Sequence, residues 1–109
     1  MGADANRTGA PIAATTSTAG EPGASAEVRT FASPARPVYV TNCDTADDLY
    51  VKVNEADASS TDFLVKLTPG QAVEMSTRSV LNVQSVSLYY ASSAYSNAKV
   101  VGWYSGSNA

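Results

Sequence analysis

The sequence contains no histidine and one cysteine among its 109 residues. Without histidine the chain lacks the commonest general base and the commonest zinc ligand. Its single cysteine, Cys43, can form neither an intramolecular disulfide nor a cysteine-rich zinc site. The glycines at positions 70, 102 and 106 stand too far apart to form a phosphate-binding loop. These absences predict a protein without enzymatic activity and without a metal or other cofactor.

Charge is also scarce, and it is mildly negative. Charged residues make up 16% of the chain and the net charge is −3, whereas globular domains average about a quarter charged residues. No cluster of Lys and Arg is present to attract a polyanion, so we expect no nucleic-acid partner. No apolar run approaches the roughly 18 residues of a membrane span, and the chain opens without a secretion signal. We therefore expect no membrane association and synthesis in the cytoplasm.

The composition changes near residue 37. Residues 1–37 hold four of the five prolines and four of the seven glycines, and their large apolar residues are few. Such a segment buries too little apolar surface to offset the roughly 1–2 kcal/mol per residue that backbone ordering costs. We therefore expect residues 1–37 to form an extended or flexible N-terminal arm. The alternating stretch at residues 27–31 could add a strand to a neighbouring sheet.

Residues 38–109 follow a period of two, which is typical of β-strands. Leu49, Val51 and Val53 fall on one face, and Thr-Pro-Gly-Gln at 68–71 predicts a type II turn. The apolar phase changes once near residues 84–85, which indicates a bulge or a corner. We expect an all-β fold, a small antiparallel β-sandwich or barrel with an extended N-terminal arm. The expected strands cover residues 38–41, 49–53, 63–67, 73–75, 80–90 and 98–104.

An acidic stretch at residues 44–48, Asp-Thr-Ala-Asp-Asp, raises the question of a calcium loop. Its spacing matches no EF-hand, and aspartates in loops commonly cap turns through bonds to the backbone. We favour the capping interpretation. Cys43, which precedes this stretch and has no base nearby in sequence, is expected to be a small half-buried residue.

Aromatic residues are concentrated toward the C-terminus. They could fill the core, form a protein interface or provide a sugar-binding platform. We expect Trp103 in the core, and the tyrosines on the opposite phase at an interface. Together with the arm, this gives the candidate partner-binding residues Ile12, Val28, Arg29, Phe31, Arg36, Tyr39, Tyr50 and Tyr89.

The order of strands and turns between Val38 and Trp103 resembles a type of small β domain found in structural proteins of tailed bacteriophages. Domains of this type contain an asparagine-ended strand, a Pro-Gly hairpin, a loop of small residues and a closing strand with Gly-Trp. The segments that carry the resemblance are residues 41–42, YVKVN at 50–54, LTPGQAVEM at 67–75, VQSVSLYYASS at 83–93 and AKVVGW at 98–103.

The resemblance implies a protein of the virion, with the major capsid protein or another virion protein as its partner. A capsid decoration (cement) protein is expected, present as a homo-oligomer or a symmetric array on the capsid surface. Its arm would staple neighbouring capsid subunits, and removal of residues 1–36 is expected to leave a folded domain that no longer binds. The alternatives are a receptor- or carbohydrate-binding module of a fibre or adhesin, and a head–tail (neck) accessory protein.

Overall fold

The computed structural model of the chain describes residues 11–75 and 82–104. These residues form an antiparallel β fold with one short 3-10 turn, η1 (Tyr95–Asn97). No helix within the described residues is long and apolar enough to cross a membrane. The all-β antiparallel prediction is confirmed. The strands are β1 (Ile12–Ala13), β2 (Thr15–Thr18), β3 (Glu27–Asn42), β4 (Leu49–Val53), β5 (Val65–Leu67), β6 (Ala72–Glu74), β7 (Val83–Tyr90) and β8 (Ala98–Tyr104).

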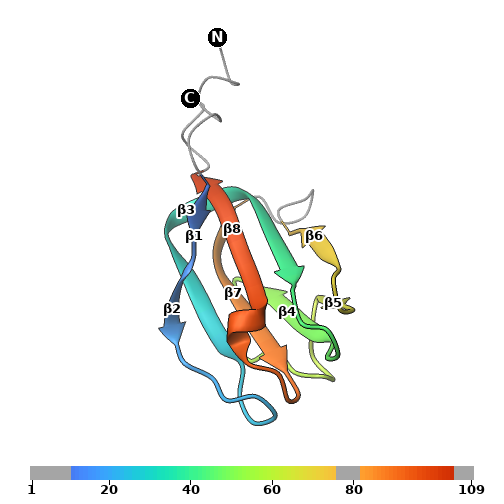
Figure 1. Cartoon of the computed structure of the whole chain (residues 1–109). Helices are drawn as coiled ribbons and strands as arrows, with labels where there is room; N and C mark the ends of the chain where they lie inside the picture. Colours follow the sequence, from blue (N-terminus) through green and yellow to red (C-terminus); the bar gives the residue numbers. More distant parts are fainter. Residues whose placement is uncertain (1–10, 76–81, 105–109) are drawn as a thin grey trace.

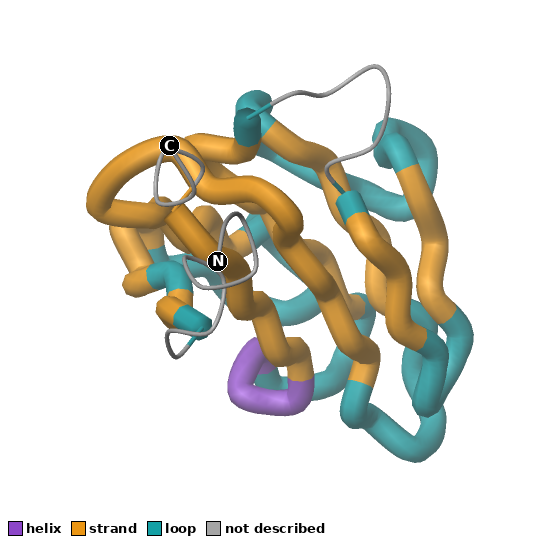
Figure 2. Tube along the Cα trace, turned by 90° about the horizontal axis from the view of Figure 1, so that it is seen from above, coloured by secondary structure: helices purple, strands orange, loops and turns teal. Residues whose placement is uncertain are grey.

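Strand β3 belongs to both layers of the sandwich. Its first half pairs with β2 and β7, and β7 continues to β4 and β5, so these strands make the first layer. Its second half pairs with β8 and β6, and β8 also pairs with β1, which makes the second layer. Figure 1 shows β3 bending at the end of the molecule where β1 begins and β8 finishes. Figure 2 shows the same strands from above, with η1 at one side.

The core lies between the two layers and collects alternate residues from each strand. In β3, Val38 and Val40 are fully buried, and in β4 the same holds for Leu49 and Val51. Because side chains on a strand point alternately to opposite faces, these positions share the inner face, as their spacing predicted. The other large core residues are Phe31, Leu67, Met75, Val83, Val86, Leu88, Tyr90, Tyr95 and Val100.

The predicted boundary at residue 37 is wrong for the described part of the N-terminal region. Residues 12–13, 15–18 and 27–37 lie in strands of the sandwich, and Phe31 and Ala35 are at most 1% exposed. Pro34 and Pro37 argue against a strand in this part of the sequence. In the structure both fall where the pairing of β3 is already interrupted. The register shifts between Thr30 and Ala35 and again between Ala35 and Val38. Proline, which lacks an N–H, is tolerated at such interruptions.

The removal of residues 1–36 would delete β1, β2 and the first half of β3. It would also expose the core positions that Phe31 covers. In contrast to the expectation above, we therefore expect that such a deletion does not leave a folded domain. Residues 1–10 lie outside the described residues.

The predicted turn and the predicted change of phase are both present. Gln71 N donates to Thr68 O at 2.9 Å, and Gly70 has a φ of 84°, which glycine adopts without strain. The register between β3 and β7 is irregular between Val83 and Ser85, where the inner positions pass from Val83 to Val86. Of the predicted strand at 80–90, residues 80 and 81 lie outside the described residues.

Replacement of Phe31 by alanine tests whether the N-terminal region belongs to the core. Phe31→Ala is expected to lower the free energy of unfolding by about 3–5 kcal/mol, because a buried ring is lost and a cavity remains. Phe63→Ala is the matched control, since Phe63 is 42% exposed and its loss should cost about 1 kcal/mol or less. Urea denaturation measures both. Equal, small losses would place Phe31 outside the folded unit.

Candidate functional site

Three aromatic side chains meet on the outer face of the first layer. Tyr50 in β4 lies opposite Tyr89 in β7, with ring centroids 6.2 Å apart. Phe63, from the connection between β4 and β5, lies on the other side of Tyr50, at 5.1 Å between ring centroids. Both tyrosines are half-buried, while Phe63 is 42% exposed. Tyr50, Phe63 and Tyr89 are named the Tyr50 cluster below.

The connection between β4 and β5, residues 54–64, is fixed onto the sheet by hydrogen bonds. Ala58 N donates to Ser87 Oγ at 3.0 Å, and both residues are buried. Asn54 has a φ of 58°, and its Oδ1 accepts a bond of 2.7 Å from Gln84 N. Asparagine is among the residues that tolerate this left-handed conformation, so the turn that starts the connection suits its sequence.

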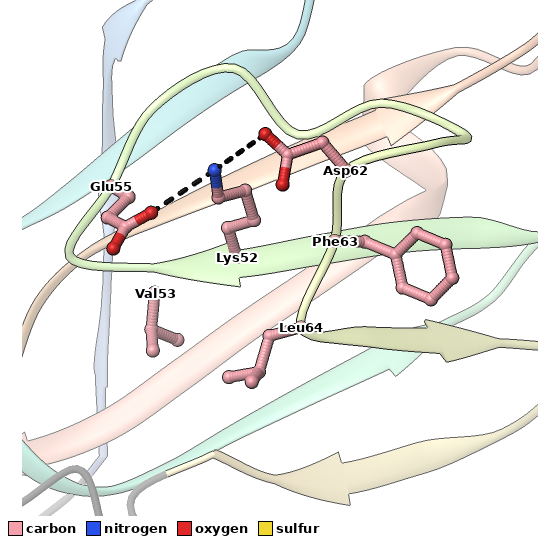
Figure 3. A pocket seen from close by; sticks show the side chains of 6 residues that line it. All are labelled: Lys52, Val53, Glu55, Asp62, Phe63 and Leu64. Atoms are coloured by element: carbon pink, nitrogen blue, oxygen red, sulfur yellow. Dashed lines mark hydrogen bonds and ion pairs between the residues drawn. The ribbon is translucent and has the colours of Figure 1, made fainter.

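An open hollow of about 310 Å³ lies between β4 and this connection. Lys52 Nζ lies 3.1 Å from Glu55 Oε1 and 3.0 Å from Asp62 Oδ2, and Figure 3 shows the ammonium between the two carboxylates. The hydrogen bond to Asp62, followed by that to Glu55, raises the pKa of Lys52, so the group stays charged. The hollow is lined by Lys52, Val53, Glu55, Asp62, Phe63 and Leu64.

The outer face of the second layer carries a smaller aromatic pair. Tyr39 and Trp103 contact edge to face, with ring centroids 6.1 Å apart and an angle of 84°. Tyr39 is 39% exposed, and Trp103 is half-buried. The expectation that Trp103 fills the core is wrong, because its position in β8 alternates with the buried Val100 and Gly102. Tyr39 is exposed and Tyr50 and Tyr89 are half-buried, so none of the three is a core residue. That they form an interface stays a prediction.

At the end of the sandwich opposite the bend of β3, a polar network surrounds the buried side chain of Asn42. Asn42 Nδ2 donates to the carbonyl oxygens of Asp47 and Leu67, both at 2.9 Å. Asn42 Oδ1 accepts from Asp44 N at 3.0 Å and from Tyr90 Oη at 2.5 Å. Burial raises the pKa of Tyr90, so its hydroxyl remains a donor. The network satisfies a fully buried amide and ties the acidic loop to the core.

Two of the three aspartates in this loop, Asp44 and Asp47, cap backbone and hydroxyl groups. Asp44 Oδ2 accepts from Asp47 N at 2.5 Å and from Ala46 N at 2.8 Å. These bonds lower the pKa of Asp44 to about 2. Asp47 Oδ2 accepts from the hydroxyls of Ser92 and Ser93, which lowers its pKa as well. The capping interpretation is therefore confirmed. Within the described residues, no group of three or more acidic or cysteine side chains is arranged to hold a metal ion.

The candidate residues of the expected arm are divided between interior and surface. Phe31 is a core residue, and Ile12 packs against the core from β1, so neither is available as part of a free arm. Arg29 is held by Glu27 Oε2 at 2.7 Å and donates to the carbonyl oxygens of Tyr95 and Ala98. These three residues therefore belong to the sandwich and not to a free arm, while their role as partner contacts stays a prediction.

The remaining two arm candidates lie nearer the surface. Val28 is half-buried and Arg36 is exposed. Cys43 is also exposed, contrary to the expected half-buried position, because the strand ends at Asn42 and the next residue enters the loop.

The sequence alone does not predict the hollow. Lys52, Glu55 and Asp62 are ten residues apart at most, but opposite charges at such spacing occur in any solvated loop. Their convergence depends on how the connection folds over β7, through Ala58 and Ser87. No local sequence signal carries that information. The expected strand at residues 63–67 includes Phe63, but β5 begins only at Val65.

Comparison of the chain with models of known protein families, with curated proteins and with solved structures finds no match.

Acid titration of an Asp44→Asn variant tests the capping network. The pKa of Asp44 falls from the ordinary 3.8 to about 2 on folding. The ionised group therefore stabilises the fold fully above about pH 4, and this contribution is lost as the pH falls through 2. The variant should be less stable than the native chain at pH 7 and lose less stability between pH 4 and 2, as measured by urea denaturation. Asp48→Asn, which alters a carboxylate without a side-chain hydrogen bond among the described residues, is the control. Identical acid profiles for the native chain and Asp44→Asn would contradict the assignment.

Proposed function

We propose that the protein is a non-enzymatic structural protein of a bacteriophage virion, a capsid decoration (cement) protein that binds the major capsid protein. Two features support this function. The first is the resemblance of residues 38–103 to small β domains of tailed-phage structural proteins. The second is the pairing of the first and last described strands of the β-sandwich, β1 and β8, which suits a compact module attached at one end.

The observation that carries the proposal is the pairing of β1 with β8. Ile12 lies opposite Gly102, and Ala13 lies opposite Val101. The chain therefore enters and leaves the sandwich at the same end. The bend of β3 lies there too, since Ala35 pairs with Tyr104. Residues 32–34 and Arg36 in this bend are exposed. This end is the attachment end in the proposal. The acidic loop lies at the other end of the sandwich (Figure 1) and would therefore face away from the capsid.

Attachment is assigned to the residues that precede β1, together with the exposed bend of β3. Ten residues span at most on the order of 30 Å when extended. A segment that binds a second subunit adds avidity without a large interface, because its effective concentration is set by the short connection. A symmetric array of copies on the capsid surface multiplies the effect.

A matched pair of terminal deletions tests the proposal. Removal of residues 1–10 keeps every described strand and should abolish co-sedimentation with empty capsids, while circular dichroism and unfolding remain those of the full chain. Removal of residues 105–109, which follow β8 in the sequence, is the control and should leave binding within about twofold.

Two outcomes would contradict the capsid assignment. Full retention of capsid binding after removal of residues 1–10 would refute the attaching segment. Failure of the full chain to bind capsids, combined with a discrete ring in negative-stain images, would favour the head–tail accessory protein instead.

A further inference from the structure

We infer that the hollow between β4 and residues 54–64 is a binding site for a neutral saccharide of one or two pyranose rings. This inference goes beyond the capsid function and does not depend on it. It rests on an exposed aromatic residue, an anchored ammonium and two partly free carboxylates that line one open hollow, with the ring of Phe63 directed away from the Lys52 ammonium (Figure 3). The lining residues are shown in Figure 3.

The apolar part of the site suits the carbon-bound face of a sugar ring. Phe63 and Leu64 are 42% and 59% exposed, and they are two of the three large apolar side chains that the described surface leaves most open. Phe63 does not stand alone, because Tyr50 supports it at 5.1 Å between ring centroids. A ring held in this way offers a rigid flat surface at a low cost in side-chain entropy.

The polar part of the site offers donors and acceptors that suit hydroxyl groups. Lys52 has three N–H donors and uses two of them on Glu55 and Asp62. The Lys52 side chain is 15% exposed, whereas those of Glu55 and Asp62 are 70% and 65% exposed. Each ion pair uses one carboxylate oxygen, so the other oxygen of Glu55 and of Asp62 has no partner among the described residues. One donor and two charged acceptors can bond the hydroxyls of a polyol, and bonds to charged groups are the stronger ones.

The charge balance selects a neutral ligand. Two carboxylates against one ammonium leave the hollow with a net negative charge. An anionic sugar or a phosphate would be repelled, and the chain as a whole carries −3. A cationic side chain would have to compete with Lys52 for the same carboxylates. Hydroxyl groups add to the existing bonds and displace none of them.

The site is formed before a ligand arrives. The bond from Ala58 N to Ser87 Oγ and the bonds of Asn54 to residues 82 and 84 hold residues 54–64 against β7. A preformed site loses less entropy on binding than a loop that must order itself. The volume of about 310 Å³ lies near the lower end of the range for small-molecule pockets, roughly 300–1,000 Å³. Its size and openness suit a mono- or disaccharide, or the end of a longer glycan.

The test is a titration of the full-length, isotope-labelled protein, followed by amide chemical shifts. The probes are the methyl glycosides of glucose, galactose, mannose and N-acetylglucosamine, with sialyllactose as the anionic probe and tri-arginine as the cationic one. At least one neutral glycoside should give saturable shifts at Tyr50, Lys52, Glu55 and residues 62–64. Sialyllactose and tri-arginine should bind more weakly.

Phe63→Ala should weaken the binding of that glycoside by about tenfold, because the stacking surface is lost. Tyr39→Ala is the matched control, since Tyr39 has similar exposure on the other layer, and it should leave binding unchanged. Asp62→Asn, which keeps the size of the side chain, should also weaken binding and provides a second test if Phe63→Ala folds poorly.

The inference is overturned if no neutral glycoside saturates, if the shifts map to other residues, or if tri-arginine or sialyllactose binds better. Equal affinities of Phe63→Ala, Asp62→Asn and the native protein would also overturn it. None of these results bears on the co-sedimentation experiment, so the two proposals can fail separately.

Discussion

The continuity of β3 is the constraint on which the rest of the structure depends. This strand supplies hydrogen bonds to β2 and β7 through its first half and to β6 and β8 through its second half. A sandwich of about 100 residues has a small core and little stability in reserve. One strand that takes part in both layers fixes their relative position through covalent geometry. The side chains of Phe31, Val38 and Val40 then fill the space between the layers.

The polar network around Asn42 lies at the end of the sandwich where β3 finishes. A buried amide costs stability unless each of its groups finds a partner, and Asn42 finds four. The same network holds the acidic loop. Within this loop Asp44 and Asp47 accept capping hydrogen bonds from backbone and hydroxyl groups. The first layer carries a different arrangement on its outer face, where Glu55 and Asp62 remain largely exposed. The contrast in hydrogen bonding, and not the count of acidic residues, separates a structural loop from a candidate site.

The sequence predicts the local features of this fold well and its long-range features poorly. The alternation of Leu49, Val51 and Val53, the turn at residues 68–71 and the limits of the last strand follow from periodicity and turn chemistry alone. The membership of residues 27–37 in the sheet does not, because Pro34 and Pro37 lower any estimate of strand content. The interruption that accommodates them exists only once β7 and β8 are in place. For the same reason the hollow beside Lys52 could not be predicted, since its walls meet through the packing of Ala58 on Ser87.

The pairing of β1 with β8 has a mechanical consequence. A force applied between the two chain ends acts first on the hydrogen bonds between β1 and β8, starting around Ile12 and Gly102, and breaks them one at a time. A load applied to the N-terminal side alone, with the body of the sandwich held elsewhere, passes through β1 and β2 to the first half of β3. The bonds of several strands then resist it together. The direction of pull therefore decides whether this small domain opens easily or resists.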